Sequence, residues 1–391
     1  MNSPVPKKPF SILCIVGARP NFMKIAPIMA ALSALEPKVD VKLLHTGQHY
    51  DIAMNQQYFD ALGIPSPDIN LEVGSGSHAF QTADVMRRFE PALDEVQPTA
   101  VLVVGDVNST IACALVATKK GIPVIHVEAG LRSFDRAMPE EINRVLTDQI
   151  SDLLFTTEES GRENLLREGV ADHRIQFVGN VMIDTLRRNL DRAVPVTETI
   201  AQAGRSDFLN QPRMNAADTG YAILTLHRPS NVDDRDILKA LLETASTISK
   251  RTPVIFPLHP RTRATIESFG LGRLLDNPDI LLLPPMGYLE MLGLMKDARV
   301  VLTDSGGIQE ETTALGVPCI TLRNNTERPI TVDEGTNTVA GQDPVRIMAI
   351  YEELMAGGGK AGRVPKFWDG KAAVRIADAL VVWMNNGCVT P

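Results

Sequence analysis

Two segments that lie far apart in this chain each place charged and glycine residues directly after a run of apolar, mostly β-branched residues. They are residues 124–132 (VIHVEAGLR) and residues 300–311 (VVLTDSGGIQEE). Each pattern is typical of a buried parallel strand that ends in a turn and leads into a helix. Open α/β sheets bind ligands at the carboxyl ends of their strands. Because one such end lies in each half of the chain, we expect a central cleft between two α/β domains, with anion-binding groups on one side of the ligand and carboxylates on the other.

The size and charge of the chain exclude several classes of protein. With 391 residues, it exceeds what one ordinary core supports, so two domains are expected. A formal net charge of −8 argues against non-specific binding to nucleic acid, and no apolar stretch is long enough to span a bilayer. We therefore expect a globular protein with neither nucleic-acid nor membrane partners.

The N-terminus and the cysteines indicate the compartment. Lys7 and Lys8 precede the apolar run 10–16 as in a signal peptide, but this run is short and leads straight into Gly17, so we interpret it as a strand and a loop. Four cysteines occur at widely spaced positions, namely Cys14, Cys113, Cys319 and Cys388. No pair has the spacing of metal ligands, so we predict a cytoplasmic protein with reduced thiols, without a disulfide or a structural zinc site.

Apolar runs of strand length alternate with helix-length segments along most of the chain. The runs expected to be strands are 10–16, 39–45, 100–105, 124–128, 152–156 and 175–178 in the first half, and 221–226, 252–258, 279–283, 299–303 and 317–322 in the second. This alternation predicts an α/β protein with two Rossmann-like domains and parallel sheets. The pattern is lost over residues 191–220. We assign residues 1–185 to an N-terminal domain, residues 186–369 to a C-terminal domain, and residues 370–391 to a final helix that packs back on the first.

Two carboxylates of the first half stand where a strand is expected to end. Asp106 follows the run 100–105, where a helix N-cap is an equally good interpretation. Glu128 ends a strand that should be buried on both faces. A carboxylate there is costly unless it is paired or functional, so we favour function over an ion pair with Arg132 or His126.

Two further stretches of the first half carry charge. Glu140 stands in the first turn of an expected helix, where its spacing favours a structural pair with Arg144. Residues 17–24 join the first strand to its helix, and a glycine together with a helix N-terminus can approach an anion closely. Arg19 and Lys24 add full charges there, although the local pattern slightly favours a tight turn with two solvated cations.

The second half carries groups that suit a phosphate. His227 and His259 each follow an expected strand and each has an arginine nearby, which fits a phosphate site better than two structural histidines. Residues 304–311 (DSGGIQEE) open a helix whose N–H groups suit a diphosphate, and Glu311, one turn in, can accept hydrogen bonds from ribose hydroxyls. Arg328 follows the last strand and supplies another cation, where a solvated arginine is the alternative.

In their order along the chain, these motifs resemble the non-hydrolysing UDP-N-acetylglucosamine 2-epimerases. The resemblance runs from about Ile12 to Asp378 and is most specific at 126–132 (HVEAGLR) and 303–311 (TDSGGIQEE). The supporting motifs are GARP at 17–20, GD at 105–106, PEEINR at 139–144, HR at 227–228 and TERP at 326–329. This family has a GT-B fold and interconverts UDP-N-acetylglucosamine and UDP-N-acetylmannosamine. The resemblance therefore implies both properties for this chain.

The resemblance also implies a role for each candidate residue. Those that match the acid–base and essential residues of the family are Asp106, Glu128, Glu140 and His227. Those that match substrate contacts are Arg19 and Lys24 in the cleft, Ser305, Gly306 and Gly307 at the phosphates, Glu311 at the ribose, and the cation Arg328. Glu140, which its local spacing assigns to a structural pair, thereby becomes a catalytic candidate.

Three stretches depart from the pattern of the family. The stretch between Arg132 and Pro139 is shorter than in many bacterial members, and HRPS at 227–230 stands in place of HRRE. HTGQHYD at 45–51 replaces residues that help to hold an allosteric substrate molecule in regulated bacterial members, so we predict that activation by substrate is absent or weakened. HTGQH and the RSFD of 132–135 also resemble relatives that act on 2,3-diacetamido-glucuronate sugars, which makes such a UDP-sugar the alternative substrate.

The reaction of the family eliminates UDP to give a 2-acetamidoglucal and then adds it back with the C2 proton on the opposite face. Several carboxylates in a closed cleft suit this chemistry because acid and base exchange roles between the steps. It requires neither a metal nor another cofactor. The alternatives are a GT-B glycosyltransferase, which need not carry three acidic residues on the cleft face of its first domain, a hydrolysing epimerase, and a non-catalytic sugar-nucleotide sensor. We further expect a homodimer that serves polysaccharide biosynthesis.

Overall fold

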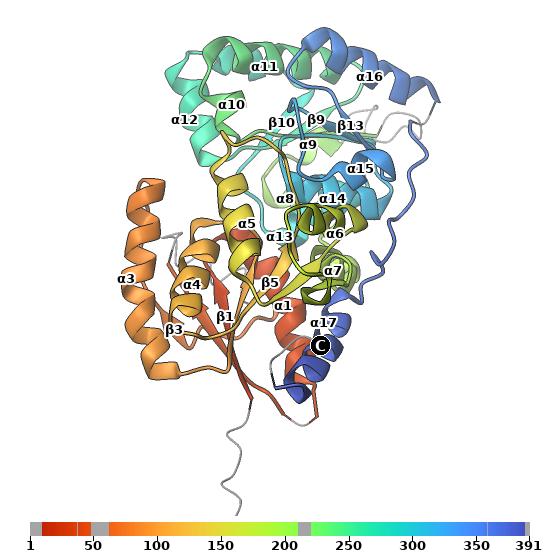
Figure 1. The fold of residues 1–391 in the computed structure, drawn as a ribbon. Helices are drawn as coiled ribbons and strands as arrows, with labels where there is room; N and C mark the ends of the chain where they lie inside the picture. The colour runs from red at the N-terminus through yellow and green to blue at the C-terminus, as the bar shows by residue number, and fades with distance from the viewer. Residues whose placement is uncertain (1–9, 37, 48–61, 210–219, 358, 388–391) are drawn as a thin grey trace, which may run out of the picture. The chain divides into compact units, whose positions relative to one another are not determined.

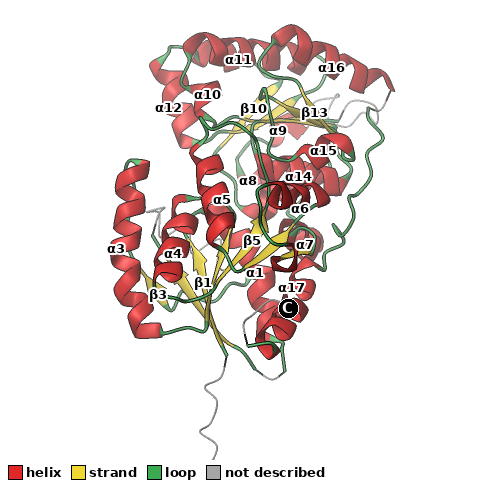
Figure 2. Ribbon diagram, in the orientation of Figure 1, coloured by secondary structure: helices red, strands yellow, loops and turns green. Residues whose placement is uncertain are grey.

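The computed structural model describes residues 10–36, 38–47, 62–209, 220–357 and 359–387. Tyr50, Asp51 and Cys388, on which expectations above depend, lie outside these residues. The chain divides into two compact units, and we call Met1–Arg187 with Lys366–Pro391 unit 1 and Arg188–Pro365 unit 2. Each unit holds one sheet of parallel strands with helices around it (Figure 1; Figure 2). The predicted fold class, α/β with two Rossmann-like domains, is therefore confirmed.

Unit 1 is built on a seven-stranded sheet in the order β3-β2-β1-β4-β5-β6-β7. Its strands are β1 (Ser11–Val16), β2 (Asp40–His45), β3 (Ile69–Asn70), β4 (Ala100–Val104), β5 (Val124–Ala129), β6 (Leu153–Thr156) and β7 (Ile175–Phe177). All neighbouring pairs are parallel. The order reverses between β1 and β4, and such a switch point is where open α/β sheets bind ligands. The two-residue β3 is too short for a sequence pattern to predict.

Helices cover both faces of this sheet because its strands are apolar on both faces. Leu13 and Ile15 of β1 join one core cluster with residues of α3 and α4. The helices of unit 1 are α1 (Arg19–Ser33), α3 (His78–Val96), α4 (Asn108–Lys119), α5 (Pro139–Ile150), α6 (Glu159–Arg167), α7 (Val181–Asn189) and α17 (Ala372–Asn385), with short 3₁₀ turns at Asp172–Arg174 and, where unit 2 begins, Leu190–Arg192. α4 packs between α3 and α5, and α1 packs on α17 (Figure 1).

The last helix, α17, contacts other parts of unit 1 near both of its ends. Asp184 of α7 accepts hydrogen bonds from the backbone N–H groups of Ala372 (3.0 Å) and Ala373 (2.7 Å), so a side chain from another helix caps the start of α17. Near the other end, the ring of Trp383 meets that of Phe10 edge to face, with 6.3 Å between the centroids. Burial raises the pKa of Asp184 to about 6, although the two backbone hydrogen bonds act to lower it.

Unit 2 is built on a six-stranded parallel sheet in the order β10-β9-β8-β11-β12-β13. Its strands are β8 (Ala222–Thr225), β9 (Val254–Pro257), β10 (Ile280–Leu283), β11 (Val300–Thr303), β12 (Cys319–Thr321) and β13 (Asn337–Val339). Its helices are α8 (Val196–Gln202), α9 (Ser206–Leu209), α10 (Pro229–Val232), α11 (Arg235–Ser249), α12 (Pro260–Ser268), α13 (Tyr288–Lys296), α14 (Gly306–Leu315), α15 (Pro329–Asp333) and α16 (Pro344–Gly357), with a 3₁₀ turn at Gly272–Leu275. Here the order reverses between β8 and β11.

Successive residues of the β11 strand serve opposite faces of the sheet of unit 2, as the two-residue period of a strand requires. Val300 and Leu302 pack in the cluster that contains residues of α11 and α16, whereas Val301 packs with residues of α8 and α13. The apolar strands are thus covered on both sides, and their carboxyl ends are left to polar residues. Among the described helices of the chain, none is long and apolar enough to cross a membrane.

Candidate active site

The first group of candidate residues lies at the switch point of unit 1, at the ends of β1, β4 and β5. The turn after β1 is tight: Asn21 accepts hydrogen bonds from the N–H groups of Gly17 (3.1 Å) and Ala18 (3.0 Å), and its own amide donates to the carbonyl of Val104 at the end of β4. A side chain at Gly17 would collide with the hydroxyl of Ser109. The glycine is therefore required by close packing, and the turn brings the start of α1 next to the end of β4.

Glu128 is held in an unusual backbone conformation at the end of β5. Its φ of 75° lies in the left-handed region, and the pairing with β6 shifts register between Val127 and Ala129. A bulge of this kind re-aims a side chain, and such strain persists where surrounding contacts enforce it. The carboxylate meets the ammonium group of Lys24 from α1 at 2.7 Å, and both side chains are buried. Two predicted site residues that are 104 positions apart are thus in direct contact.

His126 and Arg132, the expected alternatives as partners of Glu128, have buried partners of their own. Nδ1 of His126 lies 2.7 Å from Asp148, and Nε2 lies 2.9 Å from the carbonyl oxygen of Gly105. Arg132 contacts the other oxygen of Asp148 at 2.7 Å and binds Glu168 through two nitrogens. This network fixes the turns that follow β4 and β5.

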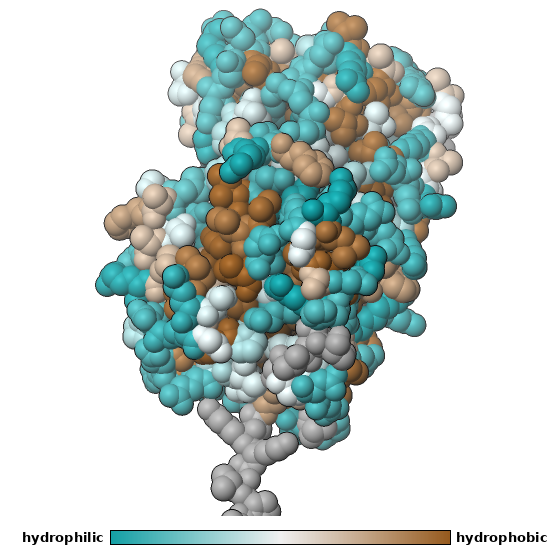
Figure 3. Space-filling model, viewed as in Figure 1, coloured by the Kyte–Doolittle hydropathy of each residue, from teal (hydrophilic) through white to brown (hydrophobic). Residues whose placement is uncertain are grey.

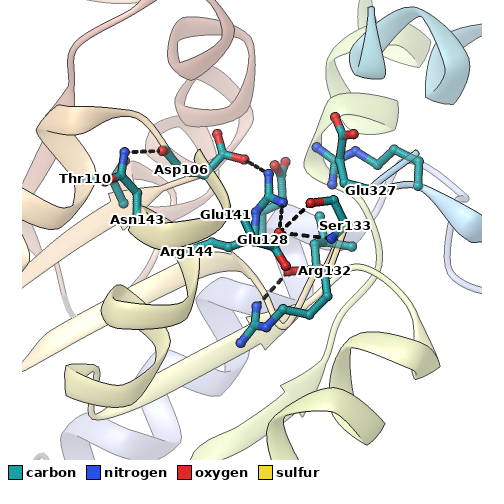
Figure 4. A network of polar contacts seen from close by, with 12 residues as sticks. Asp106, Thr110, Glu128, Arg132, Ser133, Glu141, Asn143, Arg144 and Glu327 are labelled. Atoms are coloured by element: carbon teal, nitrogen blue, oxygen red, sulfur yellow. Dashed lines mark hydrogen bonds and ion pairs between the residues drawn. The ribbon is translucent and has the colours of Figure 1, made fainter. Parts of the chain in front are cut away.

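Asp106 follows β4, and its carboxylate pairs with Arg144 of α5 (Figure 4). The alternative role as a helix cap is not what the structure shows, because α4 begins at Asn108 and the N-cap position is Val107. The same guanidinium of Arg144 pairs with Glu141. One buried guanidinium thus holds two carboxylates.

α5 is turned with its polar side inward. Its buried residues are Glu141, Arg144, Thr147 and Asp148. Ile142 and Leu146 are 44% and 51% exposed. A surface helix usually buries its apolar stripe, so this inversion signals that the buried side carries charge for a reason other than core packing. Glu141, Asn143 and Arg144 are not among the predicted site residues. The polar stripe at positions 141, 144 and 148 is a signal in the sequence that could have found Glu141 and Arg144.

The remaining candidates of unit 1 have less defined surroundings. Glu140 stands in the first turn of α5 and is partly exposed, one residue before the buried Glu141. Arg19 is the first residue of α1, and its side chain lies outside the described part of the structure.

In unit 2, His227 and Asp304 meet at the switch point between β8 and β11. Nδ1 of His227 lies 2.7 Å from Asp304, whose carboxylate also accepts hydrogen bonds from the backbone N–H groups of His227 and Arg228, each at 2.9 Å. Burial acts to raise the pKa of Asp304, but the hydrogen bond and the charge of His227 outweigh it and the pKa is lowered. Asp304 thereby orients an imidazole whose side chain is 40% exposed. This aspartate was not among the predicted site residues.

The turn at Ser305, Gly306 and Gly307 forms the start of α14, with Ser305 at the N-cap position. A side chain at Gly306 would lie 2.5 Å from Glu327. Glu327 is buried beside Arg323 at 2.7 Å. Burial acts to raise the pKa of Glu327, but Arg323 and Arg328 hold it well below its usual range.

The other candidates of unit 2 gather around the same strand ends. Arg328 is buried and pairs with Glu310 of α14 at 3.1 Å, so it is not a solvated cation. Glu311, the residue after Glu310 in α14, is also buried. The pKa of Tyr288 is raised, first by the burial of the phenol and then by the nearby charge of Glu311. His259 caps α12 by accepting a hydrogen bond from the N–H of Arg261, and its ring centroid lies 6.4 Å from that of His227.

Each unit therefore presents its predicted residues at the carboxyl ends of neighbouring strands. Unit 1 offers carboxylates fixed by cations, which suits proton transfer. Unit 2 offers histidines, arginines and a helix N-terminus, which suits an anion. Among the described residues, no group of three or more histidine, cysteine, aspartate or glutamate side chains is arranged to hold a metal ion.

The sequence and the fold of this chain are similar to those of known proteins. The model of the family "UDP-N-acetylglucosamine 2-epimerase" matches residues 32–381. The UDP-N-acetylglucosamine 2-epimerase of Methanocaldococcus jannaschii is 43% identical over 369 residues, which cover 94% of this chain and 97% of that protein. The crystal structure of the M. jannaschii enzyme in complex with UDP-GlcNAc and UDP has a TM-score of 0.84 and 41% identity, covering 95% of this chain and all of that one.

One relative differs in the substrate for which it is named. The UDP-2,3-diacetamido-2,3-dideoxy-D-glucuronate 2-epimerase of Pseudomonas aeruginosa is 40% identical over 333 residues, which cover 84% of this chain and 88% of that protein. Both this relative and the M. jannaschii enzyme are named as 2-epimerases. By its sequence and its fold, this chain belongs to the UDP-N-acetylglucosamine 2-epimerase family of isomerases.

Proposed function

We propose that this chain interconverts UDP-N-acetylglucosamine and UDP-N-acetylmannosamine by eliminating UDP to a 2-acetamidoglucal and adding it back. The observation that carries the proposal is the placement of Asp106 after β4 and of Glu128 at the end of the adjacent strand β5, each beside a cation. Inversion at C2 needs a group that takes a proton and a group that returns one, and carboxylates fixed in place supply both. Relatives named for this substrate support its identity.

The proposed reaction has two balanced steps. A base takes the proton from C2, the electrons of that bond form the C1–C2 double bond, and the bond from C1 to the diphosphate oxygen breaks. In the second step that oxygen attacks C1 again, and C2 receives a proton on the opposite face. We assign these proton transfers to Asp106, Glu128, Glu140 and His227. Lys24 and Arg144 hold the carboxylates of Glu128 and Asp106 in place, which suits both for proton transfer.

We propose that the nucleotide binds to unit 2. The N–H groups at Ser305, Gly306 and Gly307 suit the diphosphate because they open α14, and the positive end of a helix stabilises a departing anion. Glu311 is assigned to the ribose, and His259 and Arg328 to the phosphates. Arg19 and Lys24 of unit 1 are assigned to the remaining substrate contacts.

Product analysis tests the proposal. The purified chain is incubated with UDP-N-acetylglucosamine, and the products are separated and identified by nuclear magnetic resonance. We expect a mixture of the two UDP-sugar epimers. Free N-acetylmannosamine with UDP would indicate a hydrolysing epimerase, and a glycoside formed with an added acceptor would indicate a glycosyltransferase. The absence of turnover would indicate a non-catalytic sensor of sugar nucleotides.

A second candidate substrate is a UDP-2,3-diacetamido-glucuronate sugar. It is favoured by the 40% identity to the P. aeruginosa enzyme and by the sequence RSFD at 132–135. Glu141 holds the loop at Ser133 and Phe134, so this loop belongs to the same network as Asp106. The two substrates are compared by kcat/KM in the same preparation. A ratio of at least about tenfold in favour of the 2,3-diacetamido sugar would replace the first assignment.

We also propose a cytoplasmic homodimer that supplies a nucleotide sugar for polysaccharide biosynthesis. Cys14, Cys113 and Cys319 are buried free thiols, as is usual in a reducing compartment. Ile142 and Leu146 expose apolar surface on α5, and Figure 3 shows hydrophobic residues gathered over that part of unit 1. Replacing both with glutamate should turn a dimer into a monomer in light scattering. A wild-type monomer would contradict this proposal.

A further inference from the structure

We infer that Arg144 positions the carboxylate of Asp106 for the reaction, and that Glu141 holds Arg144 in place. The inference rests on the proposed function, because it assumes that Asp106 transfers protons. It adds two residues of α5, Glu141 and Arg144, neither of which needs to touch the substrate. The three side chains come from the turn after β4 and from α5 (Figure 4).

Arg144 contacts Asp106 from the buried side. The guanidinium uses Nη2 for Asp106 and Nη1 for Glu141, so one rigid planar group binds two carboxylates. The side chain of Arg144 is only 3% exposed, whereas that of Asp106 is 23% exposed. A substrate can therefore reach the carboxylate of Asp106 and not the guanidinium. This difference makes Arg144 a positioning residue rather than a catalytic one.

Glu141 is fixed from the other side by the loop that precedes α5. Its carboxylate accepts hydrogen bonds from the backbone N–H groups of Ser133 and Phe134 and from the hydroxyl of Ser133, each at 2.9 Å. Phe134 has a φ of 57°, a conformation that a bulky residue rarely adopts without such contacts. The loop, Glu141, Arg144 and Asp106 therefore form one connected chain of charge-assisted contacts.

The same helix also holds the backbone of Asp106. The amide of Asn143 donates to the carbonyl oxygen of Asp106 at 2.9 Å and lies 3.2 Å from the side-chain oxygen of Asn108 at the start of α4. α5 thus fixes both the main chain and the carboxylate of Asp106. Because a misplacement of about 1 Å costs a catalytic group on the order of 10²-fold in rate, loss of this support should act on kcat.

Two substitutions test the inference in the full-length chain. Arg144→Lys keeps the charge but replaces the planar fork, and it should lower kcat by about tenfold with KM changed less than about threefold. Arg144→Gln removes the charge and should lower kcat by about 10²-fold. Arg162→Gln serves as the matched control, because Arg162 is a partly exposed arginine of the same unit that pairs with Asp172. It should leave both constants unchanged, and an unaltered kcat in Arg144→Lys would overturn the inference.

A double-mutant cycle separates positioning from a general loss of structure. If Arg144 acts through Asp106, adding Arg144→Lys to Asp106→Asn should change kcat by less than about threefold beyond the single Asp106 variant. Effects that multiply would show that Arg144 acts by another route. Glu141→Gln should give a loss of kcat smaller than that of Arg144→Gln, because the amide can still accept from the loop but no longer pairs with the guanidinium as an ion.

The failure of this inference and the failure of the proposed function have different signatures. If Asp106→Asn is inactive while Arg144→Lys is fully active, only the positioning role is wrong. If Asp106→Asn is fully active, the proposed acid–base role of Asp106 is wrong as well. A crystal structure of Arg144→Lys adds a readout that is independent of turnover: the carboxylate of Asp106 should leave its present orientation, and an unmoved carboxylate would contradict positioning.

Discussion

The ends of β4 and β5 in unit 1 carry Asp106 and Glu128, whereas the ends of β8 and β11 in unit 2 carry His227 and Asp304. In both units these strands lie at or beside the point where the strand order reverses. In unit 1 each carboxylate is paired with a cation from a helix. In unit 2, the buried carboxylate of Asp304 binds the imidazole of His227 and two backbone N–H groups. The imidazole is therefore the partly exposed group of this pair.

The difference lies in what the flanking helices contribute. α1 and α5 bring Lys24 and Arg144 to the carboxylates of unit 1, so the strand ends keep acidic groups in a fixed geometry. α14 of unit 2 brings a glycine-rich N-terminus instead. The same kind of sheet edge thus serves proton transfer in one unit and anion binding in the other, by our proposal. The predictions below test whether the two functions separate in this way.

The largest expected effect comes from amide substitutions in unit 1. Asp106→Asn and Glu128→Gln keep size and hydrogen bonding but remove proton transfer, so each should lower kcat by at least about 10²-fold while UDP affinity changes little. Asp172→Asn, at an exposed aspartate of the same unit, is the control. A Glu128→Gln variant with full activity would show that Glu128 does not transfer a proton in the reaction.

In unit 2 we expect a smaller effect, and we expect it on UDP affinity instead of kcat. Glu311→Ala should weaken UDP binding by about 1–3 kcal/mol, the usual cost of losing a hydrogen bond to a charged group, and calorimetry with UDP measures it directly. Glu353→Ala, at an exposed position of α16, should bind UDP like the wild type. Unchanged affinity in Glu311→Ala would show that the nucleotide is not where we propose.

The smallest effect concerns stability, where the buried Asp184 of unit 1 and Asp304 of unit 2 should respond to pH with opposite signs. The folded pKa of Asp184 is raised to about 6, so its stabilising contribution is present below pH ~4 and is lost as the pH rises through ~6. The pKa of Asp304 is lowered, so its contribution is present above its ordinary pKa and is lost in acid.

Urea denaturation of each Asp→Asn variant and of the wild type gives the two slopes, between pH ~4 and ~7 for Asp184 and between pH ~2 and ~4 for Asp304. Relative to Asp184→Asn, the wild type should lose about 1–2 kcal/mol of unfolding free energy as the pH rises from ~4 to ~7. Relative to Asp304→Asn, the wild type should gain unfolding free energy as the pH rises from ~2 to ~4. Slopes of the same sign would contradict the assignment of opposite environments to the two carboxylates.

Much of the fold could be predicted from the sequence because buried parallel strands are apolar on both faces. The expected runs contain β1, β2, β4 and β6 to β12 in full. They also contain β5 except for its last residue, Ala129. β3 was missed because two residues carry no periodicity, and β13 was missed because Asn337–Val339 is mostly polar, unlike the equally short β7 and β12. The turns after β1, β4 and β11 were also predictable, because glycines and charged residues directly follow apolar runs there.

The partners within the site could not be predicted by local spacing. Glu128 was weighed against its neighbours in sequence, yet it meets Lys24 from the first helix because a bulge at positive φ re-aims it. Arg144 was weighed as a partner of Glu140, yet it binds Glu141 and Asp106 because the polar side of α5 faces inward. Contacts of this kind depend on packing between distant segments, which a single sequence does not encode in its spacing.

Turnover in D₂O shows whether C2 is inverted by elimination and re-addition. The wild-type chain is allowed to convert UDP-N-acetylglucosamine in D₂O, and the C2 position of the product epimer is examined by nuclear magnetic resonance and mass spectrometry. Because the proton taken from one face is replaced on the other, we expect deuterium at C2 of the product. A product that retains its original hydrogen at C2 would contradict elimination with exchange and with it the acid–base roles assigned to unit 1.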